Sequence, residues 1–315
     1  MWVILAIFSA FLLGIYDIFK KLSLQDNAVL PVLFFSTLTS AIVFSPLVLI
    51  SHFHPEYSNH NWYIKPQTIT GHLFFLLKSA IVGTSWIFAY FAVKNLPLTI
   101  AAPIRASAPL WTLLGALLIY GERMNLLQWV GVVLTITFYY GFSFTGKKEG
   151  ISFRKNKWVL FMTIATLVSS ASGLFDKYLL AHFDRLAVQG WSYIYMVPIN
   201  LFIITFFWLP KREQYAPFKW RNTIILIGLT LAIADFVYFK ALSLPGALIA
   251  VISTVRRSSS IVSFIFAAIL FKEQNIKIKG LLLLGILLGI ILIALGSNPN
   301  TYSSIVNFFA AIFSK

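Results

Sequence analysis

The chain is a series of long apolar blocks separated by short polar connections. Each block is about twenty residues long, the length that an α-helix needs to cross the hydrocarbon layer of a bilayer. A transmembrane β-barrel would instead show short segments of alternating hydrophobicity. The pattern predicts ten membrane-spanning helices, at residues 2–20, 29–51, 72–93, 98–120, 127–145, 158–180, 187–209, 222–243, 246–271 and 279–296.

The connections between these blocks contain turn-forming residues, such as Leu96-Pro97 and Leu244-Pro245-Gly246. The three sizeable loops are expected at 52–71, 146–157 and 210–221. Residues 303–313 form an apolar segment that is too short to span, and we expect it to lie on the membrane surface. The first block has no basic segment before it and no small-residue cleavage site after it, so we interpret it as a retained span.

The composition favours a membrane protein over a soluble one. Of the 315 residues, 59% are hydrophobic and 11% are charged, whereas soluble domains carry about 25% charged residues. The net charge of +15 would suggest nucleic acid binding in a soluble protein. Here most Lys and Arg residues flank the apolar blocks, where we expect them to face anionic headgroups. Membrane lipids are therefore the expected partners, and nucleic acid is not.

Lys and Arg are distributed unevenly between the two sets of loops, with fifteen in one set and six in the other. Cytoplasmic loops of membrane proteins carry the excess of basic residues. The charge bias therefore predicts that both termini lie outside the cytoplasm.

The two halves of the chain repeat, and each half holds five expected spans. The matching features are residues 14–17 with 173–176, Tyr90-Phe91 with Tyr238-Phe239, Leu96-Pro97 with Leu244-Pro245, and Arg105 and Glu122 with Arg256 and Glu273. Because five is odd, the second half should be inserted upside down relative to the first, as is common in secondary transporters. We divide the chain into a first repeat (1–146), a basic linker (147–157), a second repeat (158–296) and a tail (297–315).

The end of the fourth expected span carries a recognisable motif. Pro109 lies inside that span, Gly121-Glu122-Arg123 closes it, and Gln128 and Gly131 open the next one. A weaker copy, Lys272-Glu273 followed by Gly280, lies in the second half. This duplicated series resembles the drug/metabolite transporter superfamily, specifically its EamA-type ten-helix members.

The resemblance covers about residues 2–296 and implies an all-α integral membrane fold of two inverted five-helix repeats, in the inner or plasma membrane of the cell. Two positions depart from the family's pattern, because Leu13 stands where a Trp is frequent and Ser260 stands at the position that matches Pro109. Many family members are described with cytoplasmic termini, which is the opposite of the prediction from charge.

Two charged residues lie inside expected spans at the same depth. Asp235 lies ten residues before Pro245 and Arg256 lies eleven residues after it. At the rise of an α-helix, both side chains lie roughly 15 Å from the turn, near the middle of the membrane. One interpretation is a purely structural ion pair. The other is that Arg256 binds a carboxylate or phosphate of a solute, while Asp235 holds Arg256 in the empty site or carries a coupling proton.

Arg105 is the repeat counterpart of Arg256 and lies between Pro103 and Pro109. Two prolines so close together should bend the helix and free backbone carbonyl groups, and interrupted helices are where transporters build binding sites. A bend that serves packing alone is the alternative. Trp86, Tyr90 and Tyr238 lie at matching depths in the third and eighth spans, and they are the candidates for the walls of a pocket.

Four further acidic residues lie near the ends of spans and are candidates for coupling sites or for structural ion pairs. Asp17 and Asp176 are expected to form interfacial pairs with nearby lysines (Lys20, Lys21 and Lys177), and Glu122 and Glu273 with the adjacent Arg123 and Lys272. Gly285 and Gly289 allow close helix approach, either within the chain or between two copies. The protein is therefore expected to be a monomer or a homodimer.

These features together predict a secondary transporter that moves a small organic metabolite by alternating access. Its solute would be anionic or zwitterionic, such as an amino acid, and the resemblance favours export. The chain has no phosphate-binding loop, zinc-protease motif or nucleophile elbow, so we expect no enzymatic activity and no cofactor or metal. The alternatives are an intramembrane enzyme that acts on a lipid-linked substrate and a non-transporting scaffold.

Overall fold

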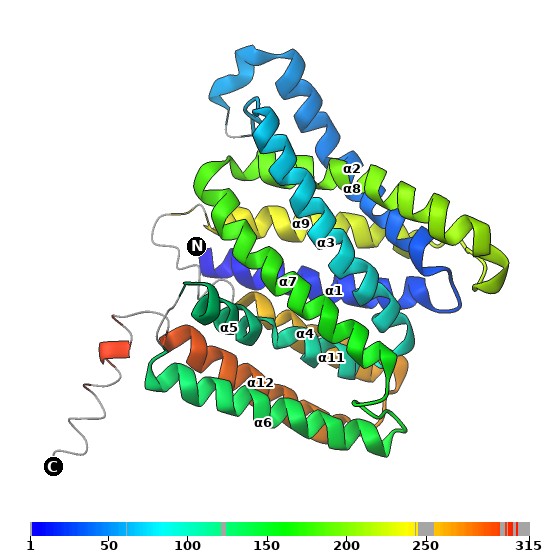
Figure 1. Cartoon of the computed structure of the whole chain (residues 1–315), viewed down its shortest axis with the longest axis vertical. Coiled ribbons are helices and arrows are strands. Elements are labelled where there is room, and N and C mark those ends of the chain that lie inside the picture. Colours follow the sequence, from blue (N-terminus) through cyan, green and yellow to red (C-terminus); the bar gives the residue numbers. More distant parts are fainter. Residues whose placement is uncertain are drawn as a thin grey trace. The chain divides into compact units, whose positions relative to one another are not determined.

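A computed structural model of the chain describes residues 2–60, 62–120, 124–242, 244, 255–296, 300, 302–304 and 307. Within these ranges all regular structure is helical. The elements (Figure 1) are α1 (Trp2–Leu24), α2 (Val29–Phe53), η1 (Pro55–Asn59), α3 (Ile69–Asn95), α4 (Leu98–Ala106), α5 (Ala108–Tyr120), α6 (Leu126–Lys148), α7 (Lys157–His182), α8 (Arg185–Ile203), η2 (Ile204–Trp208), η3 (Leu209–Gln214), α9 (Asn222–Leu242), α11 (Ser259–Phe271) and α12 (Ile276–Gly296).

Seven helical stretches in the described part of the chain are long and apolar enough to cross a membrane. They are α2, α3, α6, α7, the run Arg185–Gln214, α9 and α12. The predicted all-α membrane fold is confirmed. The fourth expected span is two helices, α4 and α5, and part of the ninth lies outside the described residues, as does most of the apolar tail segment 303–313.

The helices form two compact units, and each unit takes segments from both halves of the sequence. Unit 1 comprises Met1–Gly14, Pro97–Asn156 and Val237–Lys315, and unit 2 comprises Ile15–Leu96 and Lys157–Phe236. Two of the four boundaries between the units fall inside α1 and α9, and the other two lie between helices. The two sequence repeats are therefore interleaved, so that helices of one repeat pack against helices of the other within each unit.

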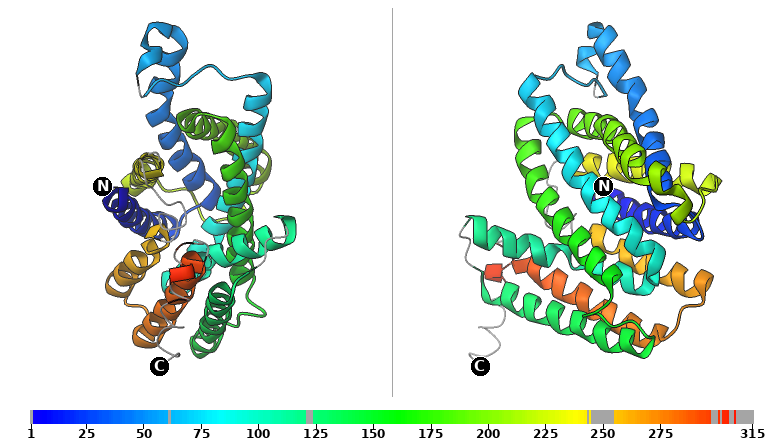
Figure 2. Two further views of the ribbon diagram at one scale, coloured as in Figure 1. Left: turned by 90° about the vertical axis from the view of Figure 1, so that its left-hand side faces the viewer. Right: turned by 45° about the vertical axis from the view of Figure 1, so that its right-hand side comes forward.

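In unit 1, α6 lies alongside α12 (Figures 1 and 2). A Cβ atom added at Gly289 would lie 2.8 Å from the Gly131 carbonyl oxygen, and one added at Gly285 would meet the ring of Phe138. The small residues of α12 are thus used for an intrachain contact with α6. The alternative of a seam between two copies has no support from these glycines.

Gln128, one of the motif residues, has a structural role at the start of α6. The Asn125 side chain accepts a hydrogen bond from the Gln128 backbone at 3.0 Å, and the Gln128 side chain accepts one from the Asn125 backbone at 3.0 Å. This capping box satisfies amide groups that have no partner within the helix. The Asn125 amide also donates to the Gly296 carbonyl at 2.7 Å, which joins the beginning of α6 to the end of α12.

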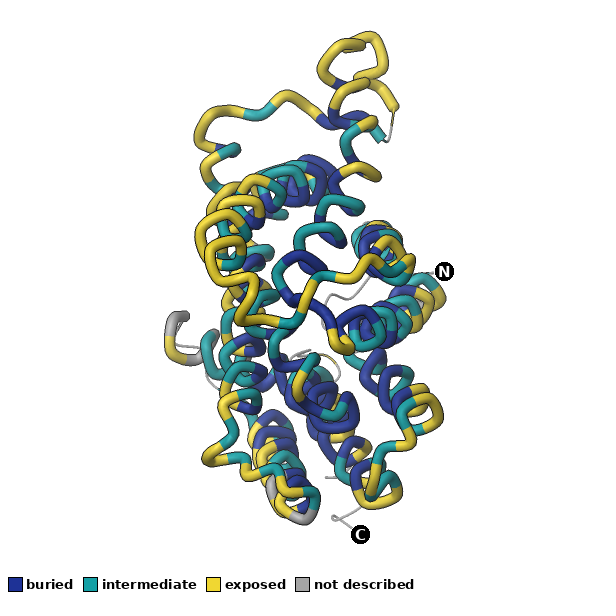
Figure 3. The backbone as a smooth tube through the Cα atoms, turned by 90° about the vertical axis from the view of Figure 1, so that its right-hand side faces the viewer, coloured by how far each residue is buried: buried dark blue, intermediate teal, exposed yellow. Residues whose placement is uncertain are grey.

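In unit 2, α3 packs against α7, and α2 packs against α8. Serine hydroxyls join helices of this unit by donating to backbone carbonyls, from Ser85 of α3 to Ala165 of α7 at 2.7 Å and from Ser40 of α2 to Gly228 of α9 at 3.0 Å. Small hydroxyl residues suit helix packing in a membrane because they permit close approach. Buried and exposed residues alternate along the helices (Figure 3), and the exposed ones include many large apolar side chains, as lipid contact requires.

The seam between α6 and α12 generates a prediction. We expect Gly289→Ala to lower the free energy of unfolding by about 1–3 kcal/mol, because the added methyl group overpacks a contact between two backbones. The matched control is Gly83→Ala in α3, where a Cβ atom has nothing within 4 Å; it should stabilise the helix by about 0.5–1 kcal/mol. Thermal unfolding of detergent-solubilised protein measures the stability of both variants. Equal effects of the two substitutions would contradict the close packing of α6 against α12 at Gly289.

Candidate functional site

Arg105 lies where the fourth predicted span is interrupted. It occupies the last turn of α4, and the Ser107 amide that follows donates to the carbonyls of Ile104 and Pro103 at 3.2 and 3.3 Å. A new helix, α5, then begins with Pro109 in its first turn. The break expected from Pro103 and Pro109 is confirmed, and Arg105 lies half-buried beside it.

Arg256, in the helical turn before α11, stacks on Tyr238 of α9. Its guanidinium carbon lies 4.0 Å from the centroid of the Tyr238 ring, which is cation–π geometry. Both residues belong to unit 1. Both residues were selected from the sequence as separate site candidates, and their contact with each other was not predicted.

Arg257 adds a third guanidinium group to this region of unit 1. It lies within electrostatic range of both Arg256 and Arg105. Sequence reasoning did not select it, because adjacent residues on a helix point about 100° apart. The three arginines are half-buried, and Arg256 and Arg105 both act electrostatically on Arg257.

Glu273 caps a helix rather than pairing with Lys272. Its two carboxylate oxygens accept hydrogen bonds from the backbone amides of Leu98 at 2.8 Å and Thr99 at 2.9 Å, at the start of α4. The expected pairing with Lys272 is wrong because the chain reverses at Lys272, which has a left-handed backbone (φ 48°). A carboxylate at a helix N-terminus is favoured by the helix dipole, so Glu273 positions α4 and with it Arg105. Its repeat counterpart Glu122 lies outside the described residues.

Lys279 is completely buried next to this cap. Its Nζ atom donates to the Thr99 hydroxyl at 3.0 Å and to Glu149 at 2.8 Å, and Asn275 donates to the other Glu149 oxygen at 2.8 Å. A cavity of about 260 Å³ is bordered by Glu149 and Glu273. The basic linker is thus anchored through Glu149, which sequence reasoning missed because it looked only at the linker's positive charges.

Asp17 and Lys20 form a buried ion pair in unit 2. The Lys20 Nζ lies 3.1 Å from the Asp17 carboxylate, and the two residues are 1% and 0% exposed. Lys20 also lies over the rings of Tyr16, at 4.3 Å, and Tyr90, at 5.2 Å. The expected pairing of Asp17 with Lys20 is confirmed. The pair is buried beside Tyr90 of α3, so the expectation that Lys20 faces headgroups is wrong.

Tyr90 completes the enclosure of this lysine. It is 1% exposed, and its hydroxyl lies 3.1 Å from the Ser36 hydroxyl of α2. Trp86, one turn earlier on α3, is half-buried. Of the two aromatic candidates on α3, Tyr90 is therefore the one enclosed by contacts with α1 and α2.

Asp176 pairs with Lys78 of α3 in unit 2. The side chain of Lys177, the partner expected from the sequence, lies outside the described part of the structure. Lys78 is 8% exposed, and its Nζ atom donates to the Asp176 carboxylate. The sequence carries a signal for Lys78, which lies inside an apolar block. A lysine in a membrane span is unfavourable by about 2.5–3.5 kcal/mol unless it has a partner, and this points to a carboxylate such as Asp176.

Asp235 accepts a hydrogen bond from the Tyr193 hydroxyl of α8 at 2.7 Å. Tyr193 is itself buried and stacks on Phe44 of α2 with ring centroids 5.4 Å apart. Asp235 belongs to unit 2 and Arg256 to unit 1, so their expected pairing stays a prediction.

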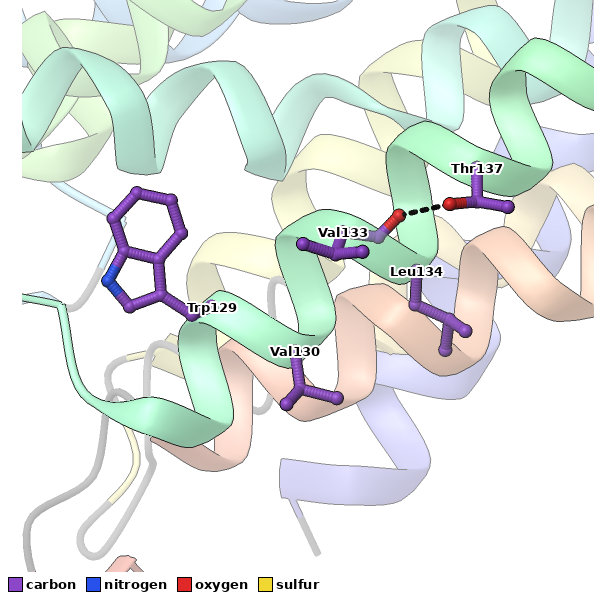
Figure 4. A pocket seen from close by; sticks show the side chains of 5 residues that line it. All are labelled: Trp129, Val130, Val133, Leu134 and Thr137. Atoms are coloured by element: carbon purple, nitrogen blue, oxygen red, sulfur yellow. Dashed lines mark hydrogen bonds between the residues drawn. The ribbon is translucent and has the colours of Figure 1, made fainter.

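An apolar groove of about 320 Å³ lies along the exposed side of α6 (Figure 4). It is lined by Trp129, Val130, Val133, Leu134 and Thr137, all from one helix. The Thr137 hydroxyl donates to the Val133 carbonyl at 2.8 Å. The groove therefore presents an apolar surface suited to lipid chains, and we do not assign it to the solute.

A comparison with known protein families identifies the family of this chain. The profile of the EamA-like transporter family matches residues 1–144 and again residues 156–295. The chain belongs to the EamA-like transporter family. It is therefore a multi-pass membrane transporter of the drug/metabolite type, and members of this family are transporters rather than enzymes.

Solved structures support the fold of this EamA-like transporter. One, described only as the crystal structure of a protein, matches with a TM-score of 0.61 and 15% sequence identity, over 93% of this chain and 97% of that one. At this identity the likeness shows the fold alone. No curated protein matches the chain.

The buried pair in this EamA-like transporter generates a prediction. Asp17→Asn leaves the Lys20 charge buried without its carboxylate, and we expect a loss of about 3–5 kcal/mol in unfolding free energy. The double variant Asp17→Asn with Lys20→Met should lose less than the sum of the two single variants, because no buried charge remains.

The control for this cycle is Glu56→Gln, which breaks the exposed pair between His54 and Glu56 at 2.7 Å. It should change stability by less than about 0.5 kcal/mol. Thermal unfolding of the four variants and the native protein gives the coupling energy. Simple additivity of the Asp17 and Lys20 variants would show that the pair is not coupled.

Proposed function

We propose that this transporter moves a small organic metabolite with an anionic group, and that Arg256 binds that group. The contact between Arg256 and Tyr238 carries the proposal. A guanidinium group that lies over an aromatic ring is held in place by the cation–π contact. Its planar fork of N–H groups matches carboxylate and phosphate oxygens, which arginine binds bidentately.

The charges around Arg256 support an anionic or zwitterionic solute, such as an amino acid. Arg105 and Arg257 contribute positive potential to the same region of unit 1. Electrostatic attraction is stronger in a low-dielectric interior than in water, so three guanidinium groups favour an anion there. The position of Arg105 beside the broken helix is the setting in which transporters bind ions and solutes.

Asp235 and the aromatic candidates complete the proposed contacts. Asp235, held by Tyr193, would bind a cationic group of the solute or carry a coupling proton. We retain Tyr238 and Trp86 as the proposed walls for the apolar part of the solute. Tyr90 contacts Lys20 and Ser36, so in this proposal it supports the buried pair.

We propose alternating access as the mechanism and export as the direction. Two similar halves give two conformations of similar energy, one open to each side. Each compact unit contains helices from both halves, so a change in one repeat is passed to the other through shared packing. Export rests on the family resemblance.

The rival functions have less support. An intramembrane enzyme needs a cluster of acidic or histidine side chains at one site. In the part of the chain that the structure describes, Asp17, Asp176 and Glu149 bind lysines, and Glu273 caps a helix. A scaffold would not need three half-buried arginines in one unit.

The test is a comparison of cells that express the native protein or a variant at matched membrane levels. We expect the native protein to redistribute one class of anionic or zwitterionic metabolite between cells and medium. Arg256→Ala should reduce that redistribution at least about tenfold, since a hydrogen-bonded contact to a charged group contributes about 1.5–3 kcal/mol. Arg256→Lys should restore it only in part, because lysine lacks the planar fork.

The control is Arg212→Ala, which removes one positive charge from an exposed position in η3. It should transport as the native protein does. Equal redistribution by the native protein and Arg256→Ala would contradict the role of Arg256. No redistribution by any of the folded, inserted proteins would contradict the transport proposal.

A further inference from the structure

Helix α8 carries a row of buried polar side chains whose hydrogen bonds are incomplete. Gln189, Ser192 and Asn200 are 4%, 6% and 3% exposed. Both polar atoms of the Gln189 amide, the Ser192 hydroxyl and the Asn200 carbonyl oxygen have no hydrogen-bond partner among the described residues. These three side chains form what we call the polar face of α8.

The three side chains share one side of the helix. Their spacing of three and then eight residues brings them close to one line along α8, and it spans roughly 16 Å at the helical rise. That length is about half the thickness of the hydrocarbon layer. The incomplete hydrogen bonds are therefore distributed along a track through the membrane and not confined to one end of the helix.

Two residues of the polar face, Ser192 and Asn200, also have polar neighbours. The Asn200 amide donates to the Thr37 hydroxyl at 3.1 Å, and Ser79 donates to the backbone carbonyl of Ser192 at 2.9 Å. Tyr193, next to Ser192, donates to Asp235. All of these residues belong to unit 2. The polar face thus lies along a seam that ends close to a membrane-embedded carboxylate.

Hydrocarbon cannot supply the missing hydrogen bonds. Buried polar groups without partners lower stability, and apolar residues of similar shape would avoid that loss. Their presence on α8 therefore indicates that another molecule completes these hydrogen bonds during the working cycle. Amide and hydroxyl groups can both donate and accept, and they carry no charge that would attract an ion, so an uncharged hydrogen-bonding partner suits them.

Helix α8 also contains two features that favour bending. Pro198 interrupts the hydrogen-bond ladder of α8 two residues before Asn200, and the helix continues as the π-helical segment η2 (Ile204–Trp208). Proline and π-helical turns are the usual causes of kinks in long helices. A bend at this point would open the polar face along the rest of α8.

We propose that the polar face of α8 is a binding site for uncharged hydrogen-bonding groups and lines the solute path through unit 2. Water supplies these groups, or a hydroxyl or amide of the solute does. The inference rests on the proposed transport function, and it extends the contacts of the solute beyond the arginines of unit 1.

The native chain contains no cysteine, so single cysteines report directly on access. The probe is the membrane-impermeant reagent 2-(trimethylammonium)ethyl methanethiosulfonate, applied to the full-length protein in membrane vesicles of both orientations. The reagent needs a hydrated thiolate. We expect Gln189→Cys and Ser192→Cys to react at least about tenfold faster than Val188→Cys, which lies on the same turn of α8 in an apolar cluster and is 0% exposed.

Ser58→Cys in the exposed loop provides the reference for full reactivity. Reaction at Gln189→Cys and Ser192→Cys no faster than at Val188→Cys, in either orientation, would overturn the proposal. Such a result would leave transport by the native protein intact, so the failure of this inference can be told from a failure of the proposed function.

A second arm identifies what occupies the site. Labelling is repeated with a deproteinised metabolite extract of the host cells on both sides of the vesicle membrane. Slower labelling of Ser192→Cys, with Ser58→Cys unchanged, assigns the site to a solute. Labelling that stays fast in the presence of the extract assigns it to water.

Discussion

The fold depends on one constraint, which is that hydrocarbon provides no hydrogen bonds and does not stabilise charge. Every charged side chain that enters the interior must therefore find its partner within the protein. Three lysines do so in three ways. Lys20 binds an aspartate on its own helix, Lys78 binds an aspartate on α7, and Lys279 binds a glutamate from the linker between the repeats. The pairs of Lys78 and Lys279 also join segments that are distant in sequence, one in each unit.

The same constraint explains the helix ends. The Nζ atom of Lys21 donates to the carbonyls of Val93 and Leu96 at 2.7 and 2.6 Å, and Lys94 donates to the Asn27 carbonyl at 2.7 Å. Carbonyls at the end of a helix lack intrahelical donors, and cations there are favoured by the helix dipole. Basic residues that the positive-inside rule counts as topology signals thus also hold α1 and α3 together. A single lysine serves both purposes because its long stem reaches across an interface.

The sequence was sufficient to predict the class of fold, because apolar block length and the duplicated motifs depend on local properties. It was also sufficient to select Arg256 and Tyr238 as separate candidates, and the structure adds the contact between them. It failed where the partner of a residue lies on a helix distant in sequence. Asp176 binds Lys78 and Glu273 binds the start of α4, and the nearest charge in sequence was a poor guide to both. Spacing along one helix predicts which residues share a face, but the helix that covers this face is decided by tertiary packing.

The most direct test of the account is transport by the purified protein. Liposomes containing the protein would be loaded with a deproteinised metabolite extract of the host cells, and mass spectrometry would follow each solute inside and outside over time. The account predicts that one class of anionic or zwitterionic solute leaves these liposomes faster than it leaves protein-free ones, and that it emerges chemically unchanged. Identical efflux with and without the folded protein, or a solute that emerges chemically altered, would contradict it.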